Sequence, residues 1–338
     1  MIAPSASERA AIVGIAGRQL TADEAALFRA HPPAGVILFA RNIADPPQLS
    51  LLIAQLRAVL SPRAAIMLDQ EGGRVARLRP PHWSAHSPAA ALGKLWQRRG
   101  ATAAIRAAWL TGALIGRDCA DAGFTVTAAP VLDLSIPGAH DVIGDRALAT
   151  EPDRIARLGR ALAAGLLAAG VQPVGKHAPG HGRAQVDSHL ALPRVDANHL
   201  DADIRPFALN ADLPWMMTAH IVYAGLDPLL PATLSPTVIG DTIRGRIGFR
   251  GVLVTDDLAM KALSGTPAYL AIQALAAGCD IALYCAGDFA PTAALLERCP
   301  PLTPEAGHRL DAARAAAERR RIAFNRDNLA AERDRLLA

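Results

Sequence analysis

The stretch GVLVTDDLAMKALSGTPAYLAIQALAAGCDIALYCAG, residues 251–287, carries the pattern that decides the fold. An apolar run over residues 251–257 ends in two aspartates, a helical pattern follows over residues 266–278, and a second apolar run covers residues 280–287. Short apolar runs bounded by turn residues are typical of buried parallel strands, which need a crossover connection between them. Gly278 stands where a helix that ends before a strand takes a left-handed residue. The stretch therefore predicts two parallel strands joined by one helix.

The same alternation extends over the rest of the chain. Six further candidate strands, which bring the total to eight, lie at residues 11–17, 35–40, 65–70, 125–133, 171–177 and 215–222. Candidate helices include residues 46–60 and 151–170, the second of which ends at Gly170. Eight parallel strands joined by right-handed crossovers close a barrel.

An open doubly wound sheet is the alternative, but it usually shows GxGxxG after its first strand, and AIVGIAGRQL (residues 11–20) lacks that motif. We therefore expect an α/β fold with a single (β/α)8 TIM-type barrel. One domain covers residues 1–338, and the residues from about 300 to 338 form a helical C-terminal extension packed on the barrel.

The composition is that of a soluble globular protein, with 51% hydrophobic and 20% charged residues among 338. The longest apolar runs are too short to span a membrane, and the first residues lack the pattern of a secretory signal. We expect a cytoplasmic protein with neither membrane nor nucleic-acid partners, because its C-terminal arginines alternate with acidic residues. The four cysteines show no CxxC spacing and are expected to be reduced and buried.

Charged and polar residues gather where the candidate strands end. They are Asp69, Glu71, Asp133, Lys176, His177, His220, Asp256 and Asp257. In this fold the carboxyl ends of the strands carry the active site. The pattern therefore predicts a catalytic pocket at that end of the barrel.

The loop KHAPGHGRAQVDSH, residues 176–189, concentrates three of the chain's ten histidines. A metal ion is one possible ligand, but HxxxH binds one metal most readily on a helix, and Pro179, Gly180 and Gly182 oppose a helix here. A phosphate-binding loop would need a lysine after its glycines, whereas Lys176 precedes them.

Proton transfer is the third interpretation of this loop. Asp187 and His189 stand two residues apart, so in an extended stretch their side chains share a side. A carboxylate beside an imidazole fixes its tautomer and raises its pKa, which suits a proton donor near neutral pH. A surface loop with locally bonded histidines is the structural alternative, and the clustering favours the acid/base role.

Two adjacent carboxylates, Asp256 and Asp257, close the apolar strand over residues 251–257. A charge in such surroundings is costly unless it is paired or used, and an aspartate there can serve as a nucleophile, a metal ligand or a helix N-cap. Because successive strand side chains diverge, we expect one of the two to face the pocket and the other to cap the following helix.

Two further motifs supply arginines. In DQEGGRVARL, residues 69–78, Asp69 with Arg74 and Arg77 can hold sugar hydroxyls or form a structural ion pair at a tight turn. In DVIGDRAL, residues 141–148, Arg146 can reach a substrate or pair with Asp145.

Taken in order, GVILFARNI, DQEGGRVARL, APVLDL, VIGDRA, GKHxPGHGxxxxDSH and VTDDLAM make the chain resemble the family 3 glycoside hydrolases. Within that family it is most similar to the bacterial β-N-acetylhexosaminidases, or β-N-acetylglucosaminidases, of cell-wall recycling. The resemblance implies a single (β/α)8 barrel and a retaining exo-enzyme that removes terminal N-acetylglucosamine from muropeptides through a covalent glycosyl-aspartate intermediate. It also implies a carbohydrate partner, a monomer, and no metal or organic cofactor.

The resemblance also implies roles for individual residues. Asp256 is expected to be the nucleophile, His189 the general acid/base, and Asp187 its dyad partner. The substrate-binding residues are expected to be Asp69, Arg77, Arg146, Lys176 and His177. Another β-glycosidase, a phosphorolytic variant of the family and a non-catalytic sugar-binding protein are the alternatives.

Overall fold

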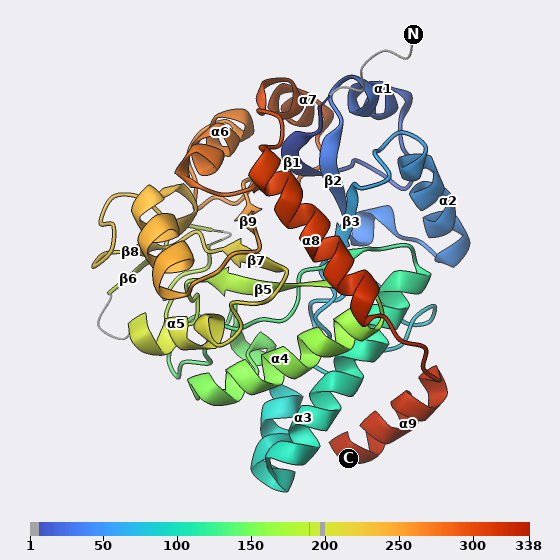
Figure 1. The fold of residues 1–338 in the computed structure, drawn as a ribbon, viewed down its shortest axis with the longest axis vertical. Coiled ribbons are helices and arrows are strands. Elements are labelled where there is room, and N and C mark those ends of the chain that lie inside the picture. Colours follow the sequence, from blue (N-terminus) through green and yellow to red (C-terminus); the bar gives the residue numbers. More distant parts are fainter. Residues whose placement is uncertain (1–6, 189, 197–199) are drawn as a thin grey trace.

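A computed structural model describes residues 7–188, 190–196 and 200–338, and its centre is a closed parallel barrel (Figure 1). The strands neighbour one another in the order β1-β10-β9-β7-β5-β4-β3-β2. Their bounds are β1 (Arg9–Gly14), β2 (Pro33–Leu38), β3 (Ala65–Leu68), β4 (Val126–Thr127), β5 (Gln172–Ala178), β7 (Trp215–Thr218), β9 (Val252–Asp257) and β10 (Ile281–Tyr284). The predicted TIM-type barrel is confirmed. A separate two-stranded sheet joins β6 (Arg194–Val195) to β8 (Val222–Tyr223).

Helices surround the barrel between the strands (Figure 1). They are α1 (Ala22–Ala30), α2 (Pro46–Arg57), α3 (Ala90–Asp121), α4 (Pro152–Ala168), α5 (Leu200–Ala208), the π-helix Val238–Arg246, α6 (Pro267–Ala277) and α7 (Phe289–Arg298). Three short 3-10 segments cover Ala40–Asn42, Gly144–Arg146 and Ala232–Leu234. As expected, Gly278 ends α6 in the left-handed region, at φ 115°. None of the helices in the described part of the chain has the length and apolarity that crossing a membrane requires.

Several strands are shorter than their apolar runs predict, and two of these runs also depart from a single regular strand. The run over 125–133 contributes only Val126 and Thr127 to the regular ladder, and Pro130 lies just beyond it without an N–H to donate. The same segment nevertheless stays against the barrel, because the N–H of Leu132 donates to the carbonyl of Lys176 at 2.8 Å. The run over 215–222 divides into β7 and β8.

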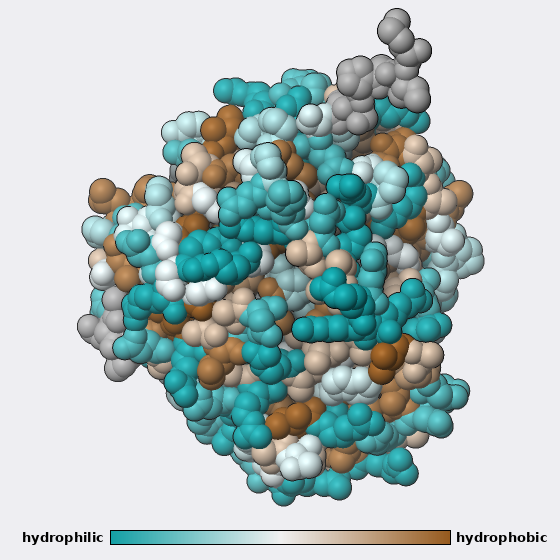
Figure 2. Space-filling model, in the orientation of Figure 1, coloured by the Kyte–Doolittle hydropathy of each residue, from teal (hydrophilic) through white to brown (hydrophobic). Residues whose placement is uncertain are grey.

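The C-terminal residues form the expected helical extension. Helix α8 (Pro304–Arg320) crosses the end of the barrel at which β1 begins, and its Leu310 and Ala313 pack against the barrel interior. The molecular face over α8 is largely hydrophilic, with scattered apolar side chains (Figure 2). This end of the barrel is therefore closed by the chain itself.

Helix α9 (Arg326–Leu337) lies along α3 (Figure 1) and is fastened there by ion pairs. Arg106 of α3 forms two 2.7 Å bonds with Glu332. Arg333 donates to Nδ1 of His86, which is 1% exposed, and Nε2 of His86 donates to Asp118 at 2.9 Å. The carbonyl of His86 accepts the N–H of Gly73, so α9 is linked to the turn after β3.

All four cysteines are buried and unbonded to one another, as expected. Cys285 differs from the other three because it lines a pocket at the carboxyl ends of the strands.

Candidate active site

A pocket of about 170 Å³ opens at the carboxyl ends of the barrel strands. The residues with predicted roles that line it are Asp69, Arg77, Arg146, Lys176, His177 and Asp256, joined by Glu71 and Asp257. Apolar side chains, among them Phe39, Met217 and Leu283, complete the wall. Side chains that lie more than 180 residues apart in the sequence, such as Asp69 and Asp256, therefore share one cavity.

One wall of the pocket is a network of alternating charges centred on Lys176. Its ammonium nitrogen lies 2.6 Å from Glu71 Oε1 and 3.0 Å from Asp69 Oδ1. The guanidinium of Arg146 forms a two-bond fork with Glu71, each bond 2.9 Å long, and Arg77 donates to Asp69 at 3.0 Å. Such charge-assisted pairs fix the side chains while leaving further donors and acceptors for a polyhydroxylated ligand.

Asp69, Glu71 and Lys176 are held in their charged forms by one another and by the arginines. Burial alone would raise the pKa of Asp69 and of Glu71, but the neighbouring Lys176 and arginines outweigh it and lower both pKa values. Burial would likewise lower the pKa of Lys176, but the two carboxylates raise it. The wall therefore presents fixed charges throughout the neutral pH range.

Of the two alternatives for Arg146, the one in which it pairs with Asp145 is wrong. Arg146 bonds to Glu71, and Asp145 instead accepts a 2.9 Å bond from Arg74. The pairs come from separate segments, which only the closed barrel brings together.

Asp133 is a fully buried carboxylate behind His177, and no role was predicted for it. Its Oδ2 accepts a 2.7 Å bond from Nδ1 of His177, and both of its oxygens accept the backbone N–H of His177, at 3.1 and 3.2 Å. Burial acts to raise the pKa of Asp133, but His177 outweighs it and the pKa is lowered. With Nδ1 occupied in this way, Nε2 is the nitrogen of His177 that remains for the pocket. Its position at the end of an apolar run was recognised in the sequence, but its bonds to His177 could not be.

The two adjacent aspartates at the end of β9 differ in their surroundings. Asp256 Oδ1 accepts the N–H of Asp257 at 2.8 Å. Burial acts to raise the pKa of Asp256, yet the nearby His177 and His220 lower it overall. Burial raises the pKa of Asp257, so Asp256 is the more readily ionised of the two.

The expectation that one aspartate faces the pocket while the other caps the next helix is wrong. Both line the pocket, and Thr266 caps α6 by accepting the N–H of Tyr269. Asp257 Oδ1 instead accepts the backbone N–H groups of Ala259 and Cys285, each at 2.9 Å. The turn of nine residues between β9 and α6 separates the helix from the strand end.

His220 lies behind these aspartates and does not line the pocket. It is fully buried, with Nε2 donating to the carbonyl of Asp257 at 3.0 Å and Nδ1 bonded to Thr233 at 2.7 Å. Its position supports the end of β9.

The loop after β5 begins with a second histidine bonded to Asp133. The N–H of His181 donates to Asp133 Oδ1 at 2.7 Å, and Nε2 of His181 is bonded to Oγ of Ser188 at 3.1 Å. One ring nitrogen of His177 and one of His181 are thus bonded to protein groups, which fixes the orientation of both rings. Burial lowers the pKa of His181 to about 4, so this ring is neutral at pH 7.

The predicted dyad is only partly described. Asp187 is half-buried, and its carbonyl accepts the N–H groups of Leu190 and Ala191, a turn-like pattern rather than the extended stretch expected from the sequence. His189 lies outside the described residues. Its proximity to Asp187 in space stays a prediction.

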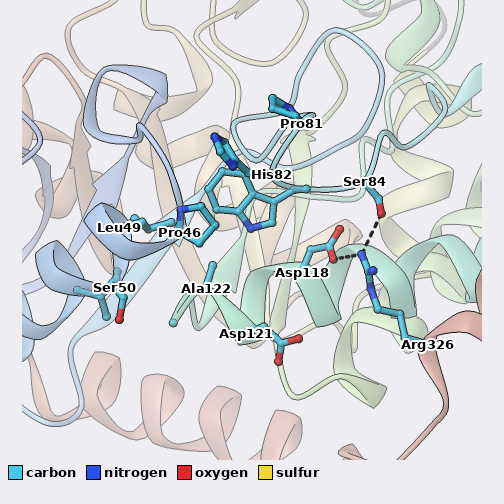
Figure 3. A pocket seen from close by; sticks show the side chains of 13 residues that line it. Pro46, Leu49, Ser50, Pro81, His82, Ser84, Asp118, Asp121, Ala122 and Arg326 are labelled. Atoms are coloured by element: carbon cyan, nitrogen blue, oxygen red, sulfur yellow. Dashed lines mark hydrogen bonds and ion pairs between the residues drawn. The ribbon is translucent and has the colours of Figure 1, made fainter.

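A larger cavity of about 520 Å³ lies elsewhere, between α2, the loop before α3 and the end of α3 (Figure 3). Trp83 forms part of its wall, and Arg326 donates there to Ser84 and Asp118. None of the residues with predicted roles lines it. The smaller pocket is the candidate active site, because charge and predicted chemistry converge there.

Comparison with known proteins gives consistent matches over almost the whole chain. The family described as glycosyl hydrolase family 3 N terminal domain matches residues 8–315. The chain is 38% identical to a β-hexosaminidase of Aromatoleum aromaticum, over 90% of this chain and 86% of that protein. It is 40% identical to a β-hexosaminidase of Alkalilimnicola ehrlichii, over 81% and 80%. The structure is similar to that of NagZ from Neisseria gonorrhoeae in complex with N-trifluoroacetyl-D-glucosamine, with a TM-score of 0.87, 32% identity, and 99% and 100% of the two chains covered.

Proposed function

The chain belongs to glycosyl hydrolase family 3 and is a β-N-acetylhexosaminidase, and we propose that it is a retaining exo-enzyme acting on muropeptides. It would remove the terminal non-reducing N-acetylglucosamine, in peptidoglycan recycling in the cytoplasm. The β-hexosaminidase names of its relatives and the N-acetylglucosamine analogue bound by the Neisseria protein support this choice of sugar.

The observation that carries the proposal is the position of Asp256 in the pocket. It is an ionised carboxylate at the end of β9, and its charge is favoured by His177 and His220. A carboxylate held ionised among apolar and cationic groups is suited to attack an anomeric carbon. Asp256 is therefore the proposed nucleophile.

His189, assisted by Asp187, is the proposed general acid/base. In the first step Asp256 bonds to the anomeric carbon, the glycosidic bond breaks, and His189 gives its proton to the leaving oxygen. In the second step His189 takes a proton from water, whose oxygen displaces Asp256 from the sugar. Two inversions retain the configuration, although a histidine replaces the second carboxylate of the usual scheme.

The charged wall is the proposed binding surface for the sugar. Asp69, Arg77, Arg146 and Lys176 would bond to hydroxyl groups, and His177 would add the nitrogen that Asp133 leaves to the pocket. Their mutual ion pairs hold them in place before the ligand arrives, which reduces the entropy lost on binding. No step of this mechanism requires a metal or an organic cofactor.

Trapping the intermediate tests the proposal directly. A 5-fluoro derivative of an N-acetylglucosaminyl fluoride should inactivate the enzyme, and mass spectrometry should find the added sugar on the peptide containing Asp256. Label on another carboxylate would reject the assignment, and absence of both label and turnover would support a non-catalytic sugar-binding protein. Release of sugar phosphate in phosphate buffer would instead identify the phosphorolytic variant. Elution as a dimer in gel filtration would contradict the monomer.

A further inference from the structure

The loop after β5 is bonded at both of its ends through side chains that the proposed mechanism does not use. At its start, Asp133 accepts the backbone N–H of His181 at 2.7 Å as well as the ring of His177. At its far end, Ser188 Oγ is bonded to Nε2 of His181 at 3.1 Å. A continuous chain of hydrogen bonds thus connects His177, Asp133, His181 and Ser188.

These groups are removed from water, so their bonds are worth more than exposed ones. Asp133 has no exposed surface, while His181 and Ser188 are 3% and 2% exposed. In the described part of the chain, Nδ1 of His181 has no hydrogen-bond partner, which leaves Ser188 as the partner of the ring. The carbonyl of Ser188 also accepts the N–H of Ala262, which ties the loop to the segment after β9.

We infer that Asp133, His181 and Ser188 are positioning residues for acid/base catalysis, and that they hold the end of the loop at the rim of the pocket. The inference rests on the roles proposed for Asp187 and His189. Ser188 lies between these two residues in the sequence, so fixing Ser188 restrains the backbone immediately before the proposed proton donor. A general acid works only within hydrogen-bonding reach of the leaving oxygen.

The same carboxylate serves the sugar-binding and proton-transferring parts of the site. Asp133 orients the ring of His177 through Nδ1 and holds the start of the loop through the N–H of His181. Sugar binding through His177 and the placement of the loop therefore both depend on the buried carboxylate of Asp133. Ser188 and His181 are bonded to each other and hold the far end of the loop, which makes them the residues of choice for a test.

The test compares Ser188→Ala, His181→Phe and His181→Gln on two N-acetylglucosaminides, one with an unactivated sugar leaving group and one with 2,4-dinitrophenolate. For the unactivated substrate, Ser188→Ala and His181→Phe should lower kcat/KM by about tenfold, the effect of one lost buried hydrogen bond. For the dinitrophenyl substrate, which needs no protonation, kcat/KM should change less than about twofold. His181→Gln, which carries an amide group able to hydrogen-bond to the Ser188 hydroxyl, should recover most of the loss.

A second measurement follows the loop without reference to turnover. Hydrogen exchange in residues 178–188 should be faster in Ser188→Ala and in His181→Phe, while exchange in the barrel strands stays unchanged. Thr111→Val is the matched control, since it removes a buried α3 hydroxyl that has no partner in the described structure. It should alter neither the kinetics nor the loop exchange.

The outcomes separate this inference from the function on which it rests. Wild-type kcat/KM on the unactivated substrate together with wild-type loop exchange in Ser188→Ala would overturn the positioning role. Equal losses on both substrates would also overturn it, because they would indicate a general structural effect. If His189→Ala itself lost activity equally on both substrates, the proposed acid/base role would fail independently of the exchange result.

Discussion

The ammonium nitrogen of Lys176 lies 2.6 Å from Oε1 of Glu71, and the two side chains are only 3% and 5% exposed. Both charges are largely removed from water, so each depends on the other and on the ion pairs around it. The sugar-binding wall is therefore also a structural element of the barrel.

Replacing Lys176 with methionine should weaken folding as well as sugar binding. Asp69 and Glu71 would keep only one arginine each, and loss of one partner from a buried ion pair typically costs about 3–5 kcal/mol of unfolding free energy. Denaturant unfolding and inhibition by N-acetylglucosamine would measure the two effects. Lys94→Met, at an exposed position of α3, should be near neutral in both assays. Wild-type stability of Lys176→Met would contradict the structural role.

The neighbouring aspartates should respond differently to the same change. Asp256→Asn should lower kcat by about 10⁴-fold or more, as expected for loss of a nucleophile, with little change in melting temperature. Asp257→Asn should stay within about tenfold of wild-type kcat, because an amide oxygen can still accept the N–H groups of Ala259 and Cys285. The reverse order of effects would move the nucleophile to Asp257.

Loss of the proposed acid/base should depend on the leaving group. His189→Ala should reduce kcat/KM by about 10²- to 10⁴-fold on substrates with poor leaving groups and far less on dinitrophenyl substrates. His82→Ala, which changes an exposed histidine away from the pocket, should have no such effect. A uniform loss in His189→Ala would favour a structural role.

Stability should fall on acidification, partly through His181. Burial lowers the pKa of this ring from 6.5 to about 4, so between these values the unfolded chain binds the extra proton. The resulting loss approaches 1.4 kcal/mol per pH unit as the pH falls from 6.5 towards 4, and it is fully present below that window. Unfolding curves across this range should be less steep in pH for His181→Gln. Parallel curves for the two proteins would contradict the lowered pKa.

The barrel could be predicted because apolar runs alternate along the chain with helical patterns that end in glycine. The long helical element α3 could not be predicted. Helix α3, residues Ala90–Asp121, is kinked at Gly100, whose φ of 81° and ψ of 176° are not helical, and it also contains Gly112, which weakens helical propensity. Gly112 is required by packing instead: a Cβ there would lie 2.0 Å from the carbonyl oxygen of Leu162 on α4. Close approach of two helices is a tertiary property that a local pattern does not reveal.

The site could be predicted at the level of residues but not of partners. Because Asp69, Lys176 and Asp256 were assigned to strand ends, they could be predicted to line the same pocket, and they do. Pairing Arg146 with Glu71 across 75 positions required the folded barrel. The importance of Asp133 likewise depends on contacts with His177 and His181 from another strand and loop.

The docking of α9 has a practical consequence for handling the protein. Arg333 donates a hydrogen bond to His86, and the carbonyl of His86 accepts the N–H of Gly73. Gly73 lies two residues after Glu71, which belongs to the charged wall of the pocket. Arg98 further bonds to the carbonyl of Leu337, so the last turn of the chain is anchored as well. An affinity tag or reporter fused after Ala338 would therefore disturb a series of contacts that runs from α9 to the sugar-binding residue Glu71. A tag fused before β1 would lie at the other end of the barrel, away from the pocket, where α8 covers the barrel interior.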